Sequence, residues 1–158
     1  MRYWYDTEFI EDSSTIDLIS IGIVCEDGRE YYAQRSECDL YKASQWVKDN
    51  VIVYLDDQSW LTQKSIKRDI LAFMDIEKYG KPELWGYYSA YDHVAFCQLF
   101  GTMMDLPKGF PMYTRDIKQW CDALGNPRLP EQGKGEHHAL HDAKWNKVAW
   151  EFLKALVK

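Results

Sequence analysis

The sequence predicts an α/β fold in which one mixed β-sheet is flanked by helices. Two observations favour this fold class. The first 33 residues contain three apolar runs separated by turn residues, which predicts an antiparallel three-strand meander. From residue 40 onward, apolar residues recur mainly at helical spacing, and strand-like runs between the helices can pair in parallel with the first strand. With 158 residues, 46% of them hydrophobic, we expect a single domain spanning residues 1–158.

The meander is predicted from residue type and turn chemistry. Tyr3, Trp4 and Tyr5 are consecutive aromatics, typical of a strand buried on both faces. Asp27-Gly28 is a strong hairpin signal between the second and third strands. The three strands are expected at residues 2–9, 18–25 and 29–33, with a polar turn at 11–17.

The rest of the chain alternates helices with short extended segments. Helical periodicity predicts helices at residues 40–51, 65–74, 92–100, 115–124 and 140–157. Gly125-Asn126-Pro127 ends the fourth of these. Strands are expected at 83–88 and near 110–113, and loops around Trp60 and at 128–136.

Composition and charge exclude several classes of protein. The net charge of −6 argues against a broad basic face for duplex nucleic acid, although an enzyme that holds a strand end through metal ions is compatible with it. No apolar run has the length of a membrane span, and no signal segment opens the chain. The four cysteines are scattered without a Cys-x-x-Cys pair, which favours reduced thiols. We therefore expect a cytoplasmic protein that contacts no membrane.

Two carboxylates interrupt the first strand. Asp6 and Glu8 are two residues apart, so both point to the same face of a strand. Burying two like charges side by side is costly, and a bound divalent cation would explain the pair. The alternative is an edge strand whose acidic end lies in solvent.

Two further stretches carry groups suited to chemistry. Asp92 follows the strand at 83–88 and opens a helix, where an aspartate can also be a simple N-cap. The run His137-His138-Ala-Leu-His141-Asp142 places three of the four histidines within five residues. Asp142 lies near the start of the last helix, where the helix dipole also favours a carboxylate.

Together these motifs resemble the DEDDh 3′–5′ exonucleases of the ribonuclease H-like superfamily. The stretches Tyr5–Asp12, Leu18–Gly22, Asp27–Ala33 and Ala90–Ala95 are most similar to the small stand-alone exoribonuclease family found in mycobacteria. The likeness runs from the first strand to the last helix. It implies a ribonuclease H-like mixed sheet flanked by helices, and a homodimer.

The resemblance implies a role for each matching carboxylate. Asp6, Glu8 and Asp142 are expected to bind one divalent ion directly. Asp6 would also contact a second ion, which Asp92 would help to hold. Oxygen ligands of this kind suit Mg²⁺ or Mn²⁺, and two ions roughly 4 Å apart can support phosphodiester hydrolysis. His137, five residues before Asp142, would be the general base, since an imidazole can take a proton at neutral pH.

Other positions are expected to contact substrate or to be neighbours of the site. His138 is the rival general base if the loop is shifted by one residue. Thr7 and Phe9 are expected to bind substrate, Phe9 by stacking on the terminal base, although plain core packing explains Phe9 equally well. Tyr88 stands where many family members have Asn. We assign no tryptophan to substrate, and the basic residues Lys64, Lys67 and Arg68 to a solvated helix face.

The predicted function is a 3′–5′ exoribonuclease that uses two Mg²⁺ or Mn²⁺ ions and releases nucleoside 5′-monophosphates from single-stranded RNA or an RNA 3′ overhang. The chemistry follows from the residues, whereas the direction and the RNA preference follow from the resemblance. Three alternatives stay open: a 3′–5′ exodeoxyribonuclease, an HD-type metal-dependent nucleotide phosphohydrolase suggested by the His-rich run, and a binding domain without catalysis.

Overall fold

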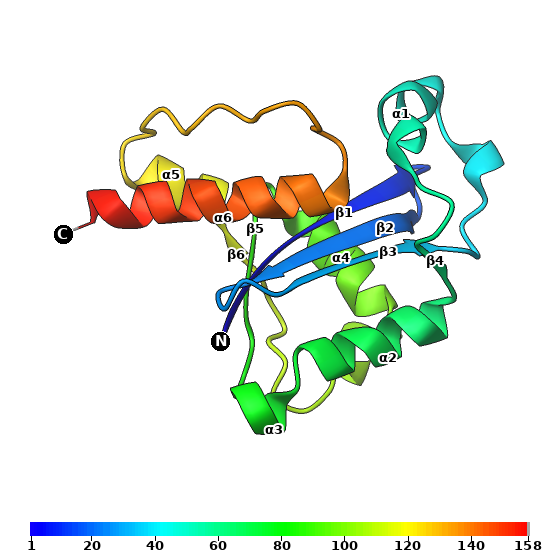
Figure 1. Cartoon of the computed structure of the whole chain (residues 1–158), viewed down its shortest axis with the longest axis horizontal. Coiled ribbons are helices and arrows are strands. Elements are labelled where there is room, and N and C mark those ends of the chain that lie inside the picture. The colour runs from blue at the N-terminus through cyan, green and yellow to red at the C-terminus, as the bar shows by residue number, and fades with distance from the viewer. Residues whose placement is uncertain (158) are drawn as a thin grey trace.

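The computed structural model describes residues 1–157, which form one six-stranded mixed sheet between two layers of helices (Figure 1). The strand order is β4-β3-β2-β1-β5-β6. Strands β1 and β2 and strands β2 and β3 pair antiparallel, and the three outer pairings are parallel. The strands are β1 (Arg2–Glu11), β2 (Ile16–Cys25), β3 (Glu30–Arg35), β4 (Trp60–Leu61), β5 (Glu83–Gly86) and β6 (Arg115–Asp116).

Helices cover both faces of this sheet (Figure 1). On one face lie α5 and the long α6, and on the other lie α2 and α4. The helices are α1 (Gln45–Asn50), α2 (Gln63–Phe73), α3 (Ile76–Tyr79), α4 (Ala90–Gln98), α5 (Ile117–Ala123) and α6 (Ala139–Leu156), with 3-10 turns at Leu40–Lys42, Ile52–Tyr54 and Met103–Asp105.

Alternation along β1 explains why its aromatics are buried on both faces. Tyr3 and Tyr5 pack in the cluster that includes residues of α2 and α4, whereas Trp4 packs against Trp150 of α6 at 5.2 Å between ring centroids. The predicted double burial of this strand is therefore confirmed. Asp6 and Glu8 follow Trp4 at the same period of two, so they lie on the α6 face of the sheet.

The start of α6 presses directly on β2 at Gly22. A β-carbon built on Gly22 would collide with the backbone of Ala139 and Leu140. Gly22 is also the cross-strand partner of Asp6. The absence of a side chain at position 22 therefore lets the first turn of α6 lie close to the acidic end of β1.

Several predicted elements needed correction. The loop expected around Trp60 contains β4, a strand of two residues that is too short to show periodicity. The helix expected at 40–51 is α1 between two 3-10 turns, because Ser44 caps a new helix through its bond from the Val47 amide (3.2 Å). The strand expected near 110–113 lies at β6, which occupies the start of the helix expected at 115–124.

The other predicted strands and helices are present with ends that differ by one or two residues, and the short helix α3 was not predicted. All four cysteines are free thiols, as their spacing predicted. No helix within residues 1–157 is long and apolar enough to cross a membrane. The mixed sheet also excludes the HD-type phosphohydrolase alternative, since that fold is all-helical.

Candidate active site

Strand β1 carries the first two carboxylates to the end of the sheet. Asp6 pairs with Gly22 and Glu8 with Ser20, and the register shifts between Glu8 and Phe9. Such a bulge re-aims the side chains that follow it. Asp6 and Glu8 therefore project together as the period of two predicted, and Phe9 begins a differently oriented segment.

Asp92 reaches the same place from the first turn of α4. It is buried, and its Oδ1 atom accepts hydrogen bonds from the Thr7 amide (2.9 Å) and the Thr7 hydroxyl (2.5 Å). Asp92 makes no N-cap bond, because Ser89 is the N-cap residue of α4. The simple capping role considered for Asp92 is therefore wrong, and its contact is with β1.

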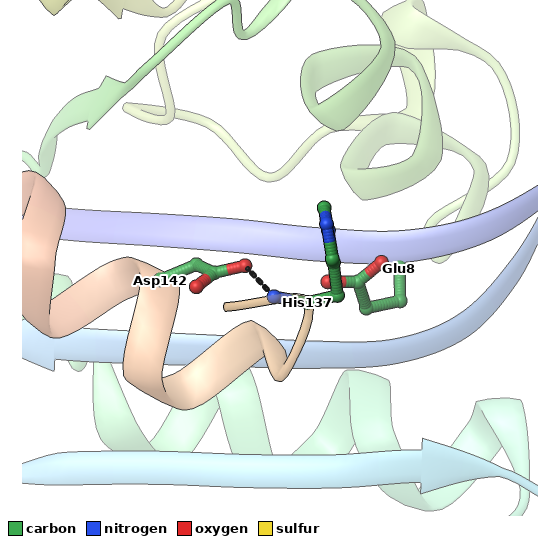
Figure 2. A group of neighbouring side chains, drawn as sticks. All are labelled: Glu8, His137 and Asp142. Atoms are coloured by element: carbon green, nitrogen blue, oxygen red, sulfur yellow. Dashed lines mark hydrogen bonds between the residues drawn. The ribbon is translucent and has the colours of Figure 1, made fainter. Parts of the chain in front are cut away.

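Asp142 lies in the first turn of α6, beside the loop that carries His137 (Figure 2). Its Oδ2 atom accepts a hydrogen bond of 2.9 Å from the His137 amide, and its Oδ1 atom accepts one from the Gln132 side chain. His137 has a left-handed backbone with φ of 68°, which is uncommon for any residue except glycine. Asp142 therefore holds the turn that brings the imidazole back over the carboxylates.

His138 lies outside this group. Its ring stacks between those of Tyr32 (4.5 Å between centroids) and His141 (4.4 Å). Burial lowers the pKa of His138 below its ordinary value, and the neighbouring His141 lowers it further. Of the two candidate bases, the structure places His137 in the cleft.

All five sequence-predicted chemical residues line one cleft of about 490 Å³: Asp6, Glu8, Asp92, His137 and Asp142. Aromatic side chains form much of its wall, and Phe9 lies edge-on to Tyr91 at 5.7 Å between centroids. Within residues 1–157, no lysine or arginine lines the cleft. Its polar surface is therefore strongly acidic.

Burial raises the pKa values of four carboxyl groups in the cleft, those of Asp6, Glu8, Asp92 and Asp142. Burial raises the pKa of Asp6 well above its ordinary value, and the charges of Asp92, Glu8 and Asp142 raise it further. Burial, followed by the charges of Asp142 and Asp92, raises the pKa of Glu8 to about 8. Burial raises the pKa values of Asp92 and Asp142 to about 6, although the hydrogen bonds that each carboxylate accepts lower its pKa.

This donor set suits a hard divalent cation. One ligand atom each from Glu8, His137 and Asp142 lies within 4.8 Å of the other two (Figure 2). Asp6 and Asp92 line the same cleft but are not part of this compact group. The four acidic groups disfavour one another's charged forms, and a bound cation would relieve this repulsion. Carboxylate oxygens are preferred ligands of Mg²⁺ and Mn²⁺.

The two expected substrate contacts have different surroundings. Thr7 lines the cleft but is buried, and its hydroxyl is committed to Asp92. Phe9 is half-buried and lines the cleft wall, so substrate contact by Phe9 stays a prediction. The basic residues of α2 do not line the cleft.

Sequence reasoning missed several neighbours of the site, among them Trp46 and Gln132. Trp46, on α1, lines the cleft and is 55% exposed, although no tryptophan was expected there. Gln132 donates to Asp142 from a stretch expected only to be a loop. Neither residue carried a local signal, because only the folded chain brings residues 46 and 132 to the end of β1.

The sheet order and its helical layers define a ribonuclease H-like α/β fold with an acidic cleft at one end of the central strand. A solved structure, described as "3'-end specific recognition of histone mRNA stem-loop by 3'-exonuclease", is similar with a TM-score of 0.58 and 12% sequence identity. The likeness covers 98% of this chain, and this chain spans 63% of that one. At this identity the likeness concerns the fold alone.

The sequence places the chain within this class. It belongs to the Rv2179c-like 3′–5′ exoribonuclease domain family, whose model matches residues 1–154. It is 47% identical over 147 residues to "3'-5' exoribonuclease Rv2179c" of Mycobacterium tuberculosis strain H37Rv, covering 91% of this chain and 88% of the relative. The same figures hold for "3'-5' exoribonuclease MT2234.1" of strain CDC 1551 / Oshkosh. The family predicted from the motifs is confirmed.

Proposed function

We propose that this chain is a divalent-metal-dependent 3′–5′ exoribonuclease that releases nucleoside 5′-monophosphates from single-stranded RNA or an RNA 3′ overhang. One observation carries the proposal. Four carboxylates from β1, α4 and α6 converge with His137 in one cleft, in a chain of the exoribonuclease family. The RNA preference and the direction of digestion rest on the names of the relatives.

Asp6, Glu8, Asp92 and Asp142 would hold Mg²⁺ or Mn²⁺ in this cleft. The bound ions would supply neutralisation of the phosphate and a lowered pKa for the attacking water. Their positive charge is needed because the cleft has no lysine or arginine among the described residues to attract an RNA phosphate. RNA binding should therefore depend on the divalent ion as strongly as hydrolysis does.

His137 would take the proton of the attacking water. The water oxygen forms the new bond to phosphorus while the bond from phosphorus to the 3′ oxygen breaks, and that oxygen takes a proton from solvent. The products are a nucleoside 5′-monophosphate and an RNA shorter by one nucleotide. No covalent bond between enzyme and substrate is needed, so no carboxylate would act as a nucleophile.

The cleft wall provides an apolar place for the terminal base. Phe9 and Tyr91 contact one another beside the carboxylates, and Tyr91 is further held by its hydroxyl bond to Glu11 (3.3 Å). Stacking of a base on an aromatic ring contributes about 1–3 kcal/mol and tolerates any base. We therefore expect digestion with little sequence preference.

A gel time course on 5′-labelled single-stranded RNA with Mn²⁺ or Mg²⁺ tests the proposal. The expected result is a ladder that shortens from the 3′ end, and no digestion with EDTA or with Asp6→Asn. Glu11→Gln is the matched control, because it removes one negative charge from the same cleft, is not a proposed ligand, and keeps an oxygen that can accept the Tyr91 hydroxyl bond. Digestion that persists in EDTA or in folded Asp6→Asn protein would refute the metal mechanism. Equal digestion of matched DNA would refute the RNA preference.

A further inference from the structure

Trp46 is a large exposed apolar residue at the mouth of the acidic cleft. It lies in the first turn of α1 and is 55% exposed. The neighbouring Val47 and Val51 pack against Ile10 and Ile19 at the end of the sheet. This packing fixes α1, and with it Trp46, beside the cleft.

The indole of Trp46 contacts the imidazole of His137. The ring centroids are 4.9 Å apart and the planes meet at 77°, an edge-to-face geometry that aromatic pairs prefer. The contact joins two segments about 90 positions apart in sequence, namely the connection from β3 to β4 and the loop before α6. It therefore ties the position of His137 to the far wall of the cleft.

The His137 ring has no hydrogen-bond partner within residues 1–157. The backbone amide of this residue donates a hydrogen bond to Asp142 (Figure 2). A histidine that acts as a base is usually oriented by a third group. Here the backbone bond places the residue, and Trp46 is the aromatic neighbour that restrains the ring.

We infer that Trp46 is a positioning residue that holds the His137 imidazole over the carboxylates through ring contact. The inference rests on the proposed function, in which His137 accepts a proton from water. It predicts that Trp46 acts on the chemical step through His137. The alternative role for an exposed indole at this position is stacking on a substrate base. In that role Trp46 would act on substrate binding.

Two substitutions separate ring contact from apolar bulk. Trp46→Leu keeps an apolar side chain without a ring, and Trp46→Phe keeps a ring. Tyr54→Ala is the matched control, because Tyr54 lies in the same connection, is 47% exposed and does not line the cleft. Each protein is assayed with Mn²⁺ on 5′-labelled single-stranded RNA, after its thermal unfolding has been compared with wild type.

The positioning role predicts a kcat for Trp46→Leu that is about ten- to a hundredfold lower, with unchanged KM, and a kcat for Trp46→Phe that is close to wild type. A raised KM with unchanged kcat would make Trp46 a base-stacking residue and overturn the inference. Full activity of Trp46→Leu would overturn it too. If the wild-type protein digests no RNA, the proposed function fails, and a second measurement decides whether Trp46 holds the ring.

That measurement is the NMR signal of the His137 ring protons, assigned with His137→Gln. In the wild type the ring current of Trp46 should displace these signals, and Trp46→Leu should return them toward those of a free histidine while Tyr54→Ala leaves them unchanged. Signals that are the same in wild type and Trp46→Leu would show that the rings do not stay in contact, and would overturn the inference whatever the activity.

Discussion

At the scale of single residues, the charged form of Asp6 is repelled by three other carboxylates. Burial and the charges of Asp92, Glu8 and Asp142 raise its pKa, so its ionised form destabilises the metal-free protein near neutral pH. We expect Asp6→Asn to raise the melting temperature in EDTA by roughly 2–4 °C, the shift that about 1 kcal/mol causes in a chain of this size. Differential scanning calorimetry measures it. A lower melting temperature would mean that Asp6 stabilises the fold by itself.

Thr7 is hydrogen-bonded to Asp92, and its hydroxyl is therefore not free to bind substrate. Its hydroxyl and amide both donate to the same carboxylate oxygen. Thr7→Val keeps the shape and the amide but removes the hydroxyl, and we expect about ten- to a hundredfold weaker metal-dependent activity, as for other outer partners of metal ligands. Thr7→Ser, which retains the hydroxyl, should recover most of that loss. Equal activity of the valine and serine variants would show that the hydroxyl is dispensable.

At the scale of elements, Gly22 determines how closely α6 approaches the sheet. A methyl group at this position would meet the backbone at Ala139 and Leu140. Gly22→Ala should therefore cost about 1–3 kcal/mol of unfolding free energy and displace Asp142 and His137 from β1, with loss of activity. Gly133→Ala is the control, since a β-carbon there has open space around it. Urea denaturation and the RNA assay test both effects, and an unaffected Gly22→Ala protein would contradict this role of Gly22.

The long elements were predictable, and the short ones were not. The apolar run of β2 extends over 10 residues and the helical periodicity of α6 over 18, so each could be recognised from the local sequence. By contrast, β4 and β6 have two residues each and exist only because β3 and β5 lie beside them. At β6, Asp116 ends the strand and caps α5 through its bond from the Lys118 amide (2.7 Å), a change of state that periodicity cannot resolve.

The same distinction holds for the site. Asp6 and Glu8 could be paired because two residues of one strand share a face, and the resemblance to the DEDDh exonucleases singled out Asp92, His137 and Asp142. The contacts of Trp46 and Gln132 depend on how the β3–β4 connection and the loop before α6 lie in space. Helical periodicity predicted a helix around Trp46 but not its place beside the cleft, and the loop that carries Gln132 has no periodicity.

At the scale of the whole molecule, the cleft should make stability depend on pH and on metal. The pKa of Glu8 is raised to about 8, so its ionisation destabilises the metal-free protein as pH rises toward and through that value. His93 and His138, whose pKa values are lowered, favour the fold as pH rises, but only up to about 6.5. Asp27, with its pKa lowered to about 2, loses its contribution only in acid.

We therefore expect the melting temperature in EDTA to fall between about pH 6.5 and 8.5, and the stabilisation by Mn²⁺ to grow over the same range, because ligands must lose their protons to bind metal. Glu8→Gln should weaken both trends, and the raised pKa of Asp6 should account for the part that remains. A metal-free melting temperature that rises with pH in this range, or a fall that Glu8→Gln leaves intact, would contradict the assignment of the effect to Glu8.

Calorimetric titration of the protein with Mn²⁺ near neutral pH tests most directly whether this acidic cleft is a metal centre. We predict binding of two ions per chain, as a two-metal site requires, loss of at least one in Asp6→Asn, and unchanged binding in Glu11→Gln. The absence of Mn²⁺ binding by folded wild-type protein, or equal binding by Asp6→Asn, would contradict the central claim that these carboxylates hold the catalytic ions.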